Sequence, residues 1–374
     1  MKIKNLITTA LAAIMSVSAM SIPTFAENNT TIDEQLFVNT AKNAIYNYIV
    51  ERGEEYYTIS DVLFNDGDID YEADNKVSFE TVATVKQKLK ASKVEELPYI
   101  QGYLNAAGLS SYADIQKGTA ASSVLNNNTP VLNTERILKV ISDRVDAANE
   151  YIGEETEISM DFYVSINPQT AITKDNMQLN CIDSLGNIVS TDEYLLPTYE
   201  TMYQSGAEEL TATIEEAGSM IEPMKNVDNW SKYNRVTARN YAWDWWGPYT
   251  SNYNPAYNNY VGKGGDCANF VSQCVYAGGV PIHGGWSPDS VAWINAASLK
   301  NNMLQYGYAT KEDAWETNAG NFAYTTAGQG HIVLVTLNDT VTLAYTAHTT
   351  NCKDQPFTQA NINGGYSFYI IKNF

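Results

Sequence analysis

The stretch "GGDCANFVSQCVYAGG", Gly264 to Gly279, decides how the C-terminal part of this 374-residue chain folds. Its apolar residues recur three and four positions apart, which is the spacing of one helical face. They are Cys267, Phe270, Val271, Cys274 and Val275. Paired glycines stand at both ends, where they permit a sharp entry and a stop. We therefore expect a helix of about three turns with Cys267 in its first turn.

The position of Cys267 favours a nucleophile. Asp266 is expected to cap the helix by accepting hydrogen bonds from its free amides. The positive end of the helix dipole favours a thiolate over a thiol, and the same amides offer an oxyanion site. The alternative is that Cys267 is one more buried residue of the apolar face. Packing is the role we expect for Cys274, while Asn269 and Gln273 are expected to brace neighbouring loops.

A nucleophilic cysteine needs a base, and the chain has three histidines. His283 lies in the glycine-rich "GGVPIHGGW" and is expected at a solvent-exposed rim. His331 opens "HIVLVTL", an apolar run typical of a buried strand. A histidine at the end of such a strand is unusual for a core residue, so we predict His331 as the base.

The next run, "VTLAYTAHTTN", predicts a second strand that pairs with the first. A two-residue turn at Asn338-Asp339 would place His331 opposite Thr346, with His348 as its diagonal neighbour on the same face. This register predicts a Cys267–His331–His348 arrangement in which His348 holds the ring of His331. A slip of one residue would send His348 to the other face.

Several motifs together resemble the putative amidase domain family of exported bacterial proteins, within the papain-like group that includes NlpC-type and CHAP cell-wall peptidases. They are "YNRVTARNYAWDWW", "YNPAYNNY", "GGDCANFVSQCVYAGG", "HIVLV" and "AHT", spread over residues 230–374. The resemblance implies a nucleophile at Cys267, a base at His331 and a polar third residue at His348. The chain departs from the family at Gly320-Asn321, where a Gly-Asp turn is usual.

The resemblance also implies a fold and a substrate. The C-terminal part is expected to be α+β and papain-like, with the Cys267 helix packed on an antiparallel sheet, and to act as a cysteine amidase or peptidase on amide bonds of peptidoglycan stem peptides. We assign substrate contacts to Asp266, Trp246, Tyr257 and Trp286, the aromatic residues having core packing as their alternative. No cofactor and no metal are implied.

Charge divides the chain into two segments. The formal net charge is −20, yet residues 230–374 hold eight basic and eight acidic residues, so the negative excess lies before them. We predict an acidic mixed α/β domain of unknown role over residues 27–229 and the amidase domain over 230–374. Helices are expected near 33–50, 94–107 and 208–224, and strands near 157–168 and 177–189. In "NDGDIDYEADN", residues 65–75, we expect a solvated acidic turn, because the spacing does not fit a calcium loop.

The first 26 residues indicate export. Lys2 and Lys4 precede an apolar stretch that ends in Thr24-Phe25-Ala26, a pattern typical of a signal peptide cut after Ala26. We expect a secreted, extracellular protein that can associate with the cell wall and has no later membrane span. The negative charge argues against nucleic acid and anionic membranes as partners.

Two other functions fit the same residues. Cys267, His331, His348 and Cys352 are ligand types that zinc accepts, although no paired CxxC motif is present. A non-catalytic module that binds the cell wall is the second alternative. A disulfide between Cys181 and Cys352 would be compatible with export.

Overall fold

The computed structural model describes residues 32–72, 75–109, 131–219, 233–247 and 252–372, together with Ser111 and Ala113. Residues 33–374 form one compact unit. The predicted signal peptide and the predicted boundary near residues 224–230 both lie outside the described residues. The division into two domains therefore stays a prediction, and the two segments are described in turn.

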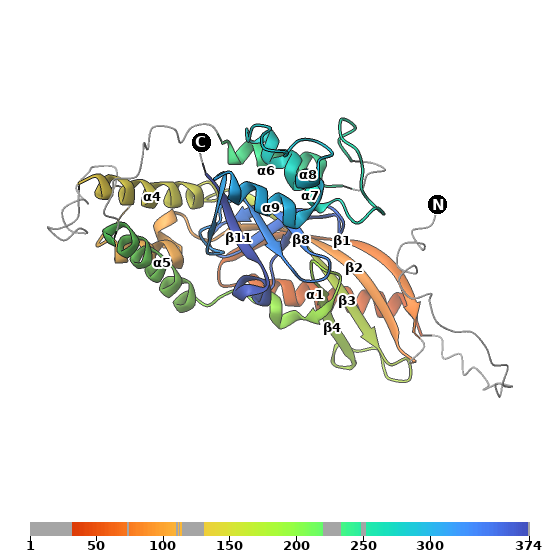
Figure 1. The fold of residues 1–374 in the computed structure, drawn as a ribbon. Coiled ribbons are helices and arrows are strands. Elements are labelled where there is room, and N and C mark those ends of the chain that lie inside the picture. The colour runs from red at the N-terminus through yellow and green to blue at the C-terminus, as the bar shows by residue number, and fades with distance from the viewer. Residues whose placement is uncertain are drawn as a thin grey trace. The chain divides into compact units, whose positions relative to one another are not determined.

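The N-terminal segment is a helix packed on an antiparallel sheet (Figure 1). Helix α1, Glu34–Gly53, begins after Asp33, whose side chain accepts from the Leu36 amide, and confirms the predicted helix. Its buried residues recur every four positions and form one face, made of Phe37, Ala41, Ile45 and Ile49. The strands pair in chain order: β1 Tyr57–Tyr71, β2 Val77–Leu89, β3 Glu155–Ile166, β4 Met177–Ile182 and β5 Ile188–Ser190.

The described residues of the N-terminal segment form three more helices: α2 Pro98–Ala106, α4 Val131–Asn149 and α5 Tyr199–Ser219. Helices α2 and α5 cross at two glycines, where their backbones nearly touch. A Cβ added to Gly102 would lie 1.9 Å from the carbonyl oxygen of Tyr203, and one added to Gly206 would lie 2.0 Å from that of Tyr99. Only glycine permits this approach.

The C-terminal segment confirms the expected helix-on-sheet arrangement. Its helices are α6 Arg235–Trp245, α7 Cys267–Ala277, α8 Val291–Ile294 and α9 Ala296–Gln305. Its strands are β6 Ala309–Glu312, β7 Phe322–Thr325, β8 His331–Asn338, β9 Leu343–Ala347, β10 Cys352–Pro356 and β11 Ser367–Ile371, with a turn of π-helix at Asn361–Gly365. They form an antiparallel sheet of order β10-β9-β8-β7-β11-β6.

Strand β8 lies in the middle of this sheet, and all eight of its residues are buried. On one face Ile332 and Leu334 join the core formed with α7, α8 and α9. On the other face Val333 and Val335 join a second core with β9, β10 and β11. Burial on both faces explains why "HIVLVTL" is a continuous apolar run rather than an alternating one.

The predicted register between β8 and β9 is wrong. Leu334, not His331, lies opposite Thr346, and a bulge separates Val335 from Leu337. The connection is longer than the predicted two residues because Asp339 folds back to accept from the amides of Val341 and Thr342.

The prediction for residues 65–75 also needs correction. Residues 65–71 belong to strand β1, which contains a bulge between Asp66 and Ile69, and do not form a turn. The acidic side chains Asp66, Asp68 and Asp70 project from a mostly exposed strand. Helix α2 and strand β3 overlap the predicted ranges. The range 177–189 holds two strands, β4 and β5, in place of one, and α5 begins at Tyr199, before the predicted start, while residues 220–224 lie outside the described residues.

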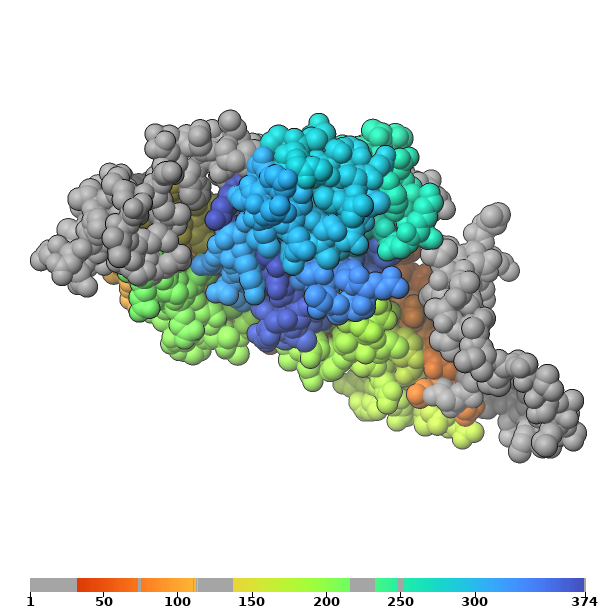
Figure 2. Space-filling view, viewed as in Figure 1, coloured from red at the N-terminus to blue at the C-terminus, as the bar shows by residue number. Residues whose placement is uncertain are grey.

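The N-terminal and C-terminal sheets contact each other directly. The Ser184 hydroxyl and the Tyr366 phenol share a buried hydrogen bond of 3.0 Å, and Gln355 donates to the carbonyl of Ile182. In the space-filling view, yellow-green atoms of the N-terminal segment lie close to dark-blue atoms from near the C-terminal end of the chain (Figure 2). Among the described helices, none is both long enough and apolar enough to cross a membrane.

Candidate active site

Cys267 is the first residue of α7, as predicted. Gly264 and Gly265 precede it with φ values of +107°, a conformation that residues with a side chain rarely adopt. Residues 262–264 are exposed and the Cys267 side chain is partly exposed, whereas the other three cysteines are buried. The nucleophile candidate therefore sits at an open helix start.

Asp266 does not cap α7 in the way the sequence predicts. Its side chain makes no capping hydrogen bond and turns inward, where it is fully buried. Its Oδ1 atom accepts from the amide of Tyr260 at 3.0 Å and from Nδ2 of Asn269 at 2.9 Å. The first-turn amides of α7 are consequently not occupied by this carboxylate.

Those amides face the sulfur instead. The backbone amides of Ile332, Ala268 and Cys267 itself favour the thiolate, while burial outweighs them and raises the pKa of the Cys267 thiol. The resting group is thus a thiol with its anion-stabilising donors already in place. The Ile332 amide is the one of these three donors that lies outside α7. Because it faces the sulfur, the start of strand β8 lies next to Cys267.

His331 is the residue directly before Ile332. Its side chain is 6% exposed, and its Nε2 atom is buried without a hydrogen-bond partner among the described residues. Burial lowers the pKa of His331 to about 4, so the imidazole is neutral at physiological pH. A neutral imidazole with a free nitrogen can accept a proton.

His348 does not lie where the predicted register placed it. Its Nδ1 atom is 2.7 Å from Oδ2 of Asp266, and its Nε2 atom is 2.7 Å from the carbonyl oxygen of Trp245. Both ring nitrogens are therefore engaged away from His331. The reason is the longer β8–β9 connection, which moves His348 along the sheet relative to the predicted pairing.

Three exposed loops adjoin these residues. Residues 262–264 precede Cys267, residues 326–329 precede His331, and residues 349–351 follow His348. The first and third are joined by the hydroxyl of Thr349, which accepts from the Asp266 amide at 3.0 Å. Exposed residues therefore lie next to Cys267, His331 and His348 along the chain.

Two of the four predicted substrate contacts have no free surface. Asp266 and Trp286 are both fully buried, and the Trp286 indole donates to the hydroxyl of Ser272 at 3.1 Å. Trp246 and Tyr257 are partly exposed, with Tyr257 stacked on Trp293 at 5.9 Å between ring centroids. Core packing, the alternative for the aromatic residues, is what the structure shows for Trp286.

The residues that fix Asp266 and the loop before it in place were not predicted from the sequence. The Asn269 amide donates to the carbonyl of Asn258 and accepts from the indole of Trp293, which confirms its bracing role but not its link to Asp266. Tyr253 also reaches the Asp266 carboxylate, at 3.3 Å. The only sequence signal for this set is a cluster of amide and phenol side chains in the ten residues before Gly262.

The remaining candidate residues lie apart from this chemistry. Cys274 is fully buried in the core, as predicted, and Cys181 and Cys352 are free thiols that are not bonded to each other. His283 packs among aromatic rings, 4.1 Å from that of Tyr308. Within the described ranges, no three His, Cys, Asp or Glu side chains are grouped as metal ligands, so the zinc alternative has no ligand set.

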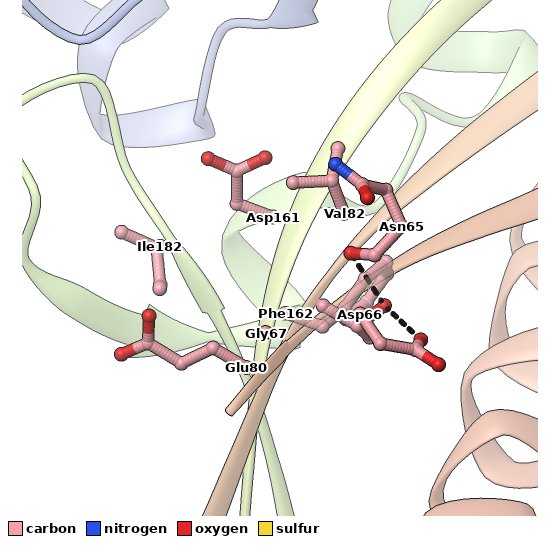
Figure 3. A pocket seen from close by; sticks show the side chains of 9 residues that line it. Asn65, Asp66, Gly67, Glu80, Val82, Asp161, Phe162 and Ile182 are labelled. Atoms are coloured by element: carbon pink, nitrogen blue, oxygen red, sulfur yellow. Dashed lines mark hydrogen bonds between the residues drawn. The ribbon is translucent and has the colours of Figure 1, made fainter. Parts of the chain in front are cut away.

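A separate pocket of about 200 Å³ lies on the N-terminal sheet (Figure 3). Asp66, Glu80 and Asp161 line it, and Asp66 is already bonded to Thr81 and paired with Lys42. Burial, with the nearby Glu80 carboxylate, raises the pKa of Asp161 to about 6. None of the lining residues belongs to the C-terminal segment, so this pocket is not part of the Cys267 site.

Comparison with known proteins places the similarity in the C-terminal segment. Residues 232–371 match the family described as "Putative amidase domain". "Uncharacterized protein YhbB" of Bacillus subtilis (strain 168) is 33% identical over 81 residues, which are 20% of this chain and 24% of the relative. "Uncharacterized protein YjcM" of the same organism is 27% identical over 132 residues, 31% of this chain and 32% of the relative. The chain thus spans about a quarter to a third of these relatives, and no solved structure matches it.

Proposed function

We propose that this protein is an exported cysteine-dependent amide hydrolase with Cys267 as nucleophile, His331 as general base and acid, and a papain-like C-terminal fold. One observation carries the proposal. The amide of Ile332 faces the sulfur of Cys267, so the only partly exposed thiol of the chain lies beside the strand that begins with His331. The match of residues 232–371 to an amidase family supports the same reaction class.

The protonation states suit general-base catalysis. The Cys267 pKa is raised by burial and the His331 pKa is lowered by burial, so the thiol and the imidazole are both neutral in the resting protein. A preformed thiolate–imidazolium pair is not needed. Nε2 of His331 removes the thiol proton as the sulfur attacks the substrate carbonyl carbon.

The remaining steps use groups already present. The carbonyl oxygen gains the negative charge of the tetrahedral intermediate, and the backbone amide of Cys267, which no capping side chain occupies, stabilises it. When the C–N bond breaks, the imidazolium of His331 returns its proton to the leaving amine. Water, deprotonated by the same imidazole, then hydrolyses the thioester and restores the thiol.

For the substrate we propose peptidoglycan stem peptides. The signal-like N-terminus brings the enzyme to the cell exterior, where these amide bonds occur, and the three exposed loops next to Cys267, His331 and His348 in the chain are the surface proposed to receive the peptide. Trp246 and Tyr257, both partly exposed, are the aromatic residues proposed for contact with the peptide or its sugars.

The test is digestion of purified peptidoglycan by the chain that begins at Glu27. Release of new amino groups and of shortened muropeptides is expected with the parent protein and is expected to vanish with Cys267→Ala. Equal release by the two proteins would reject Cys267 as the nucleophile. Sedimentation of both proteins with the wall material, without any release, would favour the non-catalytic binding module.

A further inference from the structure

We propose that His348 is a positioning residue that acts on the nucleophile's own helix through Asp266, rather than on the imidazole of His331. The inference rests on the proposed function for its importance to catalysis. Its geometry rests on a separate set of contacts, those made by Asp266 and His348.

Two consecutive residues, His348 and Thr349, both form hydrogen bonds with Asp266. His348 lies 2.7 Å from its carboxylate oxygen Oδ2, and the Thr349 hydroxyl accepts from its backbone amide at 3.0 Å. Side chain and backbone of the residue directly before Cys267 are thus both fixed by the end of β9. Thr349 has φ of +84°, a strained conformation for a β-branched residue that persists only where its surroundings impose it.

The second ring nitrogen of His348 bonds to the end of helix α6. Nε2 of His348 is 2.7 Å from the carbonyl oxygen of Trp245, the last residue of α6. A carbonyl oxygen only accepts, so this nitrogen must carry a proton. His348 therefore joins three elements at one point: the end of α6, the end of β9 and the start of α7.

The hydrogen-bond partners also assign the donors and acceptors of the pair. Oδ1 of Asp266 already accepts from the Tyr260 amide, Asn269 and Tyr253, so this carboxyl group acts as an acceptor. Its Oδ2 then needs a donor, and His348 Nδ1 is its partner. With protons on both nitrogens, His348 is an imidazolium paired with a carboxylate, both almost completely buried.

The neighbouring rings fit a charged imidazole. Phe270 stacks on it with 4.0 Å between ring centroids, and Tyr253 stacks at 5.4 Å. An aromatic face attracts a cation, most strongly in a buried setting. The titratable groups that interact with the Asp266 carboxylate are Tyr253, Tyr260 and Cys267. The pKa of each is raised, so all three are neutral at physiological pH.

This arrangement explains why Asp266 does not cap its helix. Because His348 and Asn269 draw the carboxylate inward, the amides of Cys267 and Ala268 remain free for the sulfur. Loss of the His348 contact would release the carboxylate to cap the helix in the usual way. The capped helix would lose its thiolate-stabilising donors and place a negative charge next to Cys267.

The experiment measures the rate of Cys267 alkylation by iodoacetamide in the chain from Glu27, which requires no substrate. His348→Ala is expected to slow alkylation about tenfold, since a charged hydrogen bond is lost. The same slowing is expected in a His331→Ala background. If His348 acted through His331, the effect would disappear in that background, and this outcome would overturn the proposal.

Two substitutions that keep a side-chain amide sharpen the test. His348→Asn places an amide where Nδ1 stood and retains the bond to Asp266, whereas His348→Gln reaches toward Trp245 and loses it. We expect His348→Asn, but not His348→Gln, to alkylate at the parent rate. Equal alkylation rates of these two variants would show that the His348 ring only fills space and would overturn the proposal. Because Asn and Gln are compared with each other, the result holds even if His348→Ala does not fold.

Three further measurements complete the design. Asp266→Asn combined with His348→Ala is expected to be no slower than either single variant, and His283→Ala, outside the site, should alkylate at the parent rate. Nitrogen NMR of the His348 ring should show protons on both nitrogens, and one bare nitrogen would contradict the ion pair. Normal alkylation without peptidoglycan cleavage would reject the proposed function and leave the positioning role intact.

Discussion

The phenol of Tyr57, in the first strand of the N-terminal sheet, donates to the carboxylate of Asp339, in the loop between β8 and β9, at 2.7 Å. Both residues are buried, and the same phenol lies 2.8 Å from the hydroxyl of Thr342. Asp339 shapes the loop by accepting from two of its amides. The N-terminal segment therefore supplies a donor to the loop that fixes the register of strand β9, on whose end His348 and Thr349 lie.

We predict that Tyr57→Phe lowers the free energy of unfolding by about 1–3 kcal/mol, because it leaves the buried Asp339 oxygen without its phenol donor. Urea unfolding of the whole chain measures the change. Tyr46→Phe, at a phenol whose residue is 49% exposed, is the matched control and should have almost no effect. Equal stability of the two variants would mean that the Tyr57 bond contributes nothing to the joined segments.

Thiol labelling should distinguish the two cysteines of α7. Cys267 is partly exposed and Cys274 is fully buried, so a native-state probe should modify Cys267 and spare Cys274. Cys267→Ala should abolish labelling. Cys274→Ala should leave labelling intact while it lowers stability by about 1 kcal/mol. Peptide mapping of the labelled protein checks the assignment, which fails if Cys274 carries the label.

The pH dependence of hydrolysis should report the burial of His331. Its pKa of about 4 lies below the ordinary value of 6.5, so the base stays neutral and active well below pH 6. We predict that kcat/KM on a soluble peptide substrate is nearly constant from pH 7 to 5 and falls as the pH drops through about 4. An acid limb centred near pH 6.5 would place the base in a solvent-exposed environment.

The same shift has a consequence for stability. Because the folded-state pKa of His331 is lowered, the unfolded chain binds the proton more readily between pH 6.5 and 4. The stability from the neutral, buried ring is fully present above pH 6.5 and is lost as the pH falls through about 4, by no more than about 3 kcal/mol. His331→Ala should remove this part of the pH dependence in thermal unfolding scans.

Asp161 behaves in the opposite sense. Its pKa is raised to about 6 by burial and by the Glu80 carboxylate, so its ionisation destabilises the fold as the pH rises through about 6. Asp161→Asn should therefore stabilise the protein at pH 8 by about 1 kcal/mol, a figure reduced for partial solvent exposure, and have little effect at pH 4. Denaturant titrations at the two pH values give the comparison, and an equal effect at both would exclude ionisation as the cause.

Trp286 should act as a core residue and not as a substrate contact. Trp286→Phe removes ring volume and the indole donor to Ser272, so we expect a loss of about 2 kcal/mol in stability. KM should be unchanged, because the fully buried indole has no surface for a substrate. A large rise in KM with unchanged stability would restore the prediction that Trp286 binds substrate.

Much of the C-terminal fold follows from local pattern. The three-and-four spacing around Cys267, with glycines at both ends, predicts α7 as the structure has it, and two apolar runs predict strands β8 and β9. The helix at residues 33–50 and the strand at residues 157–168 are predicted from residue spacing in the same way. These elements satisfy their local preferences and their burial at the same time, so sequence spacing alone is sufficient.

The site depends on contacts that spacing does not contain. The β8–β9 register is set by Asp339, whose role requires Tyr57, 282 residues away. The inward turn of Asp266 depends on His348, which lies 82 residues further along the chain. An aspartate that caps a helix and an aspartate that is held by a distant histidine have the same local sequence. Capping is the commoner arrangement, so the sequence favours it.

The glycine crossing of α2 and α5 has a practical meaning for anyone who wants a more heat-resistant form of this protein. Exchange of helical glycine for alanine is a common route to extra thermal tolerance, since it restricts the unfolded chain. At Gly102 and Gly206 the added methyl group would overlap a carbonyl oxygen of the opposite helix, so the exchange would wedge the pair apart. These two positions should be left untouched in any such engineering.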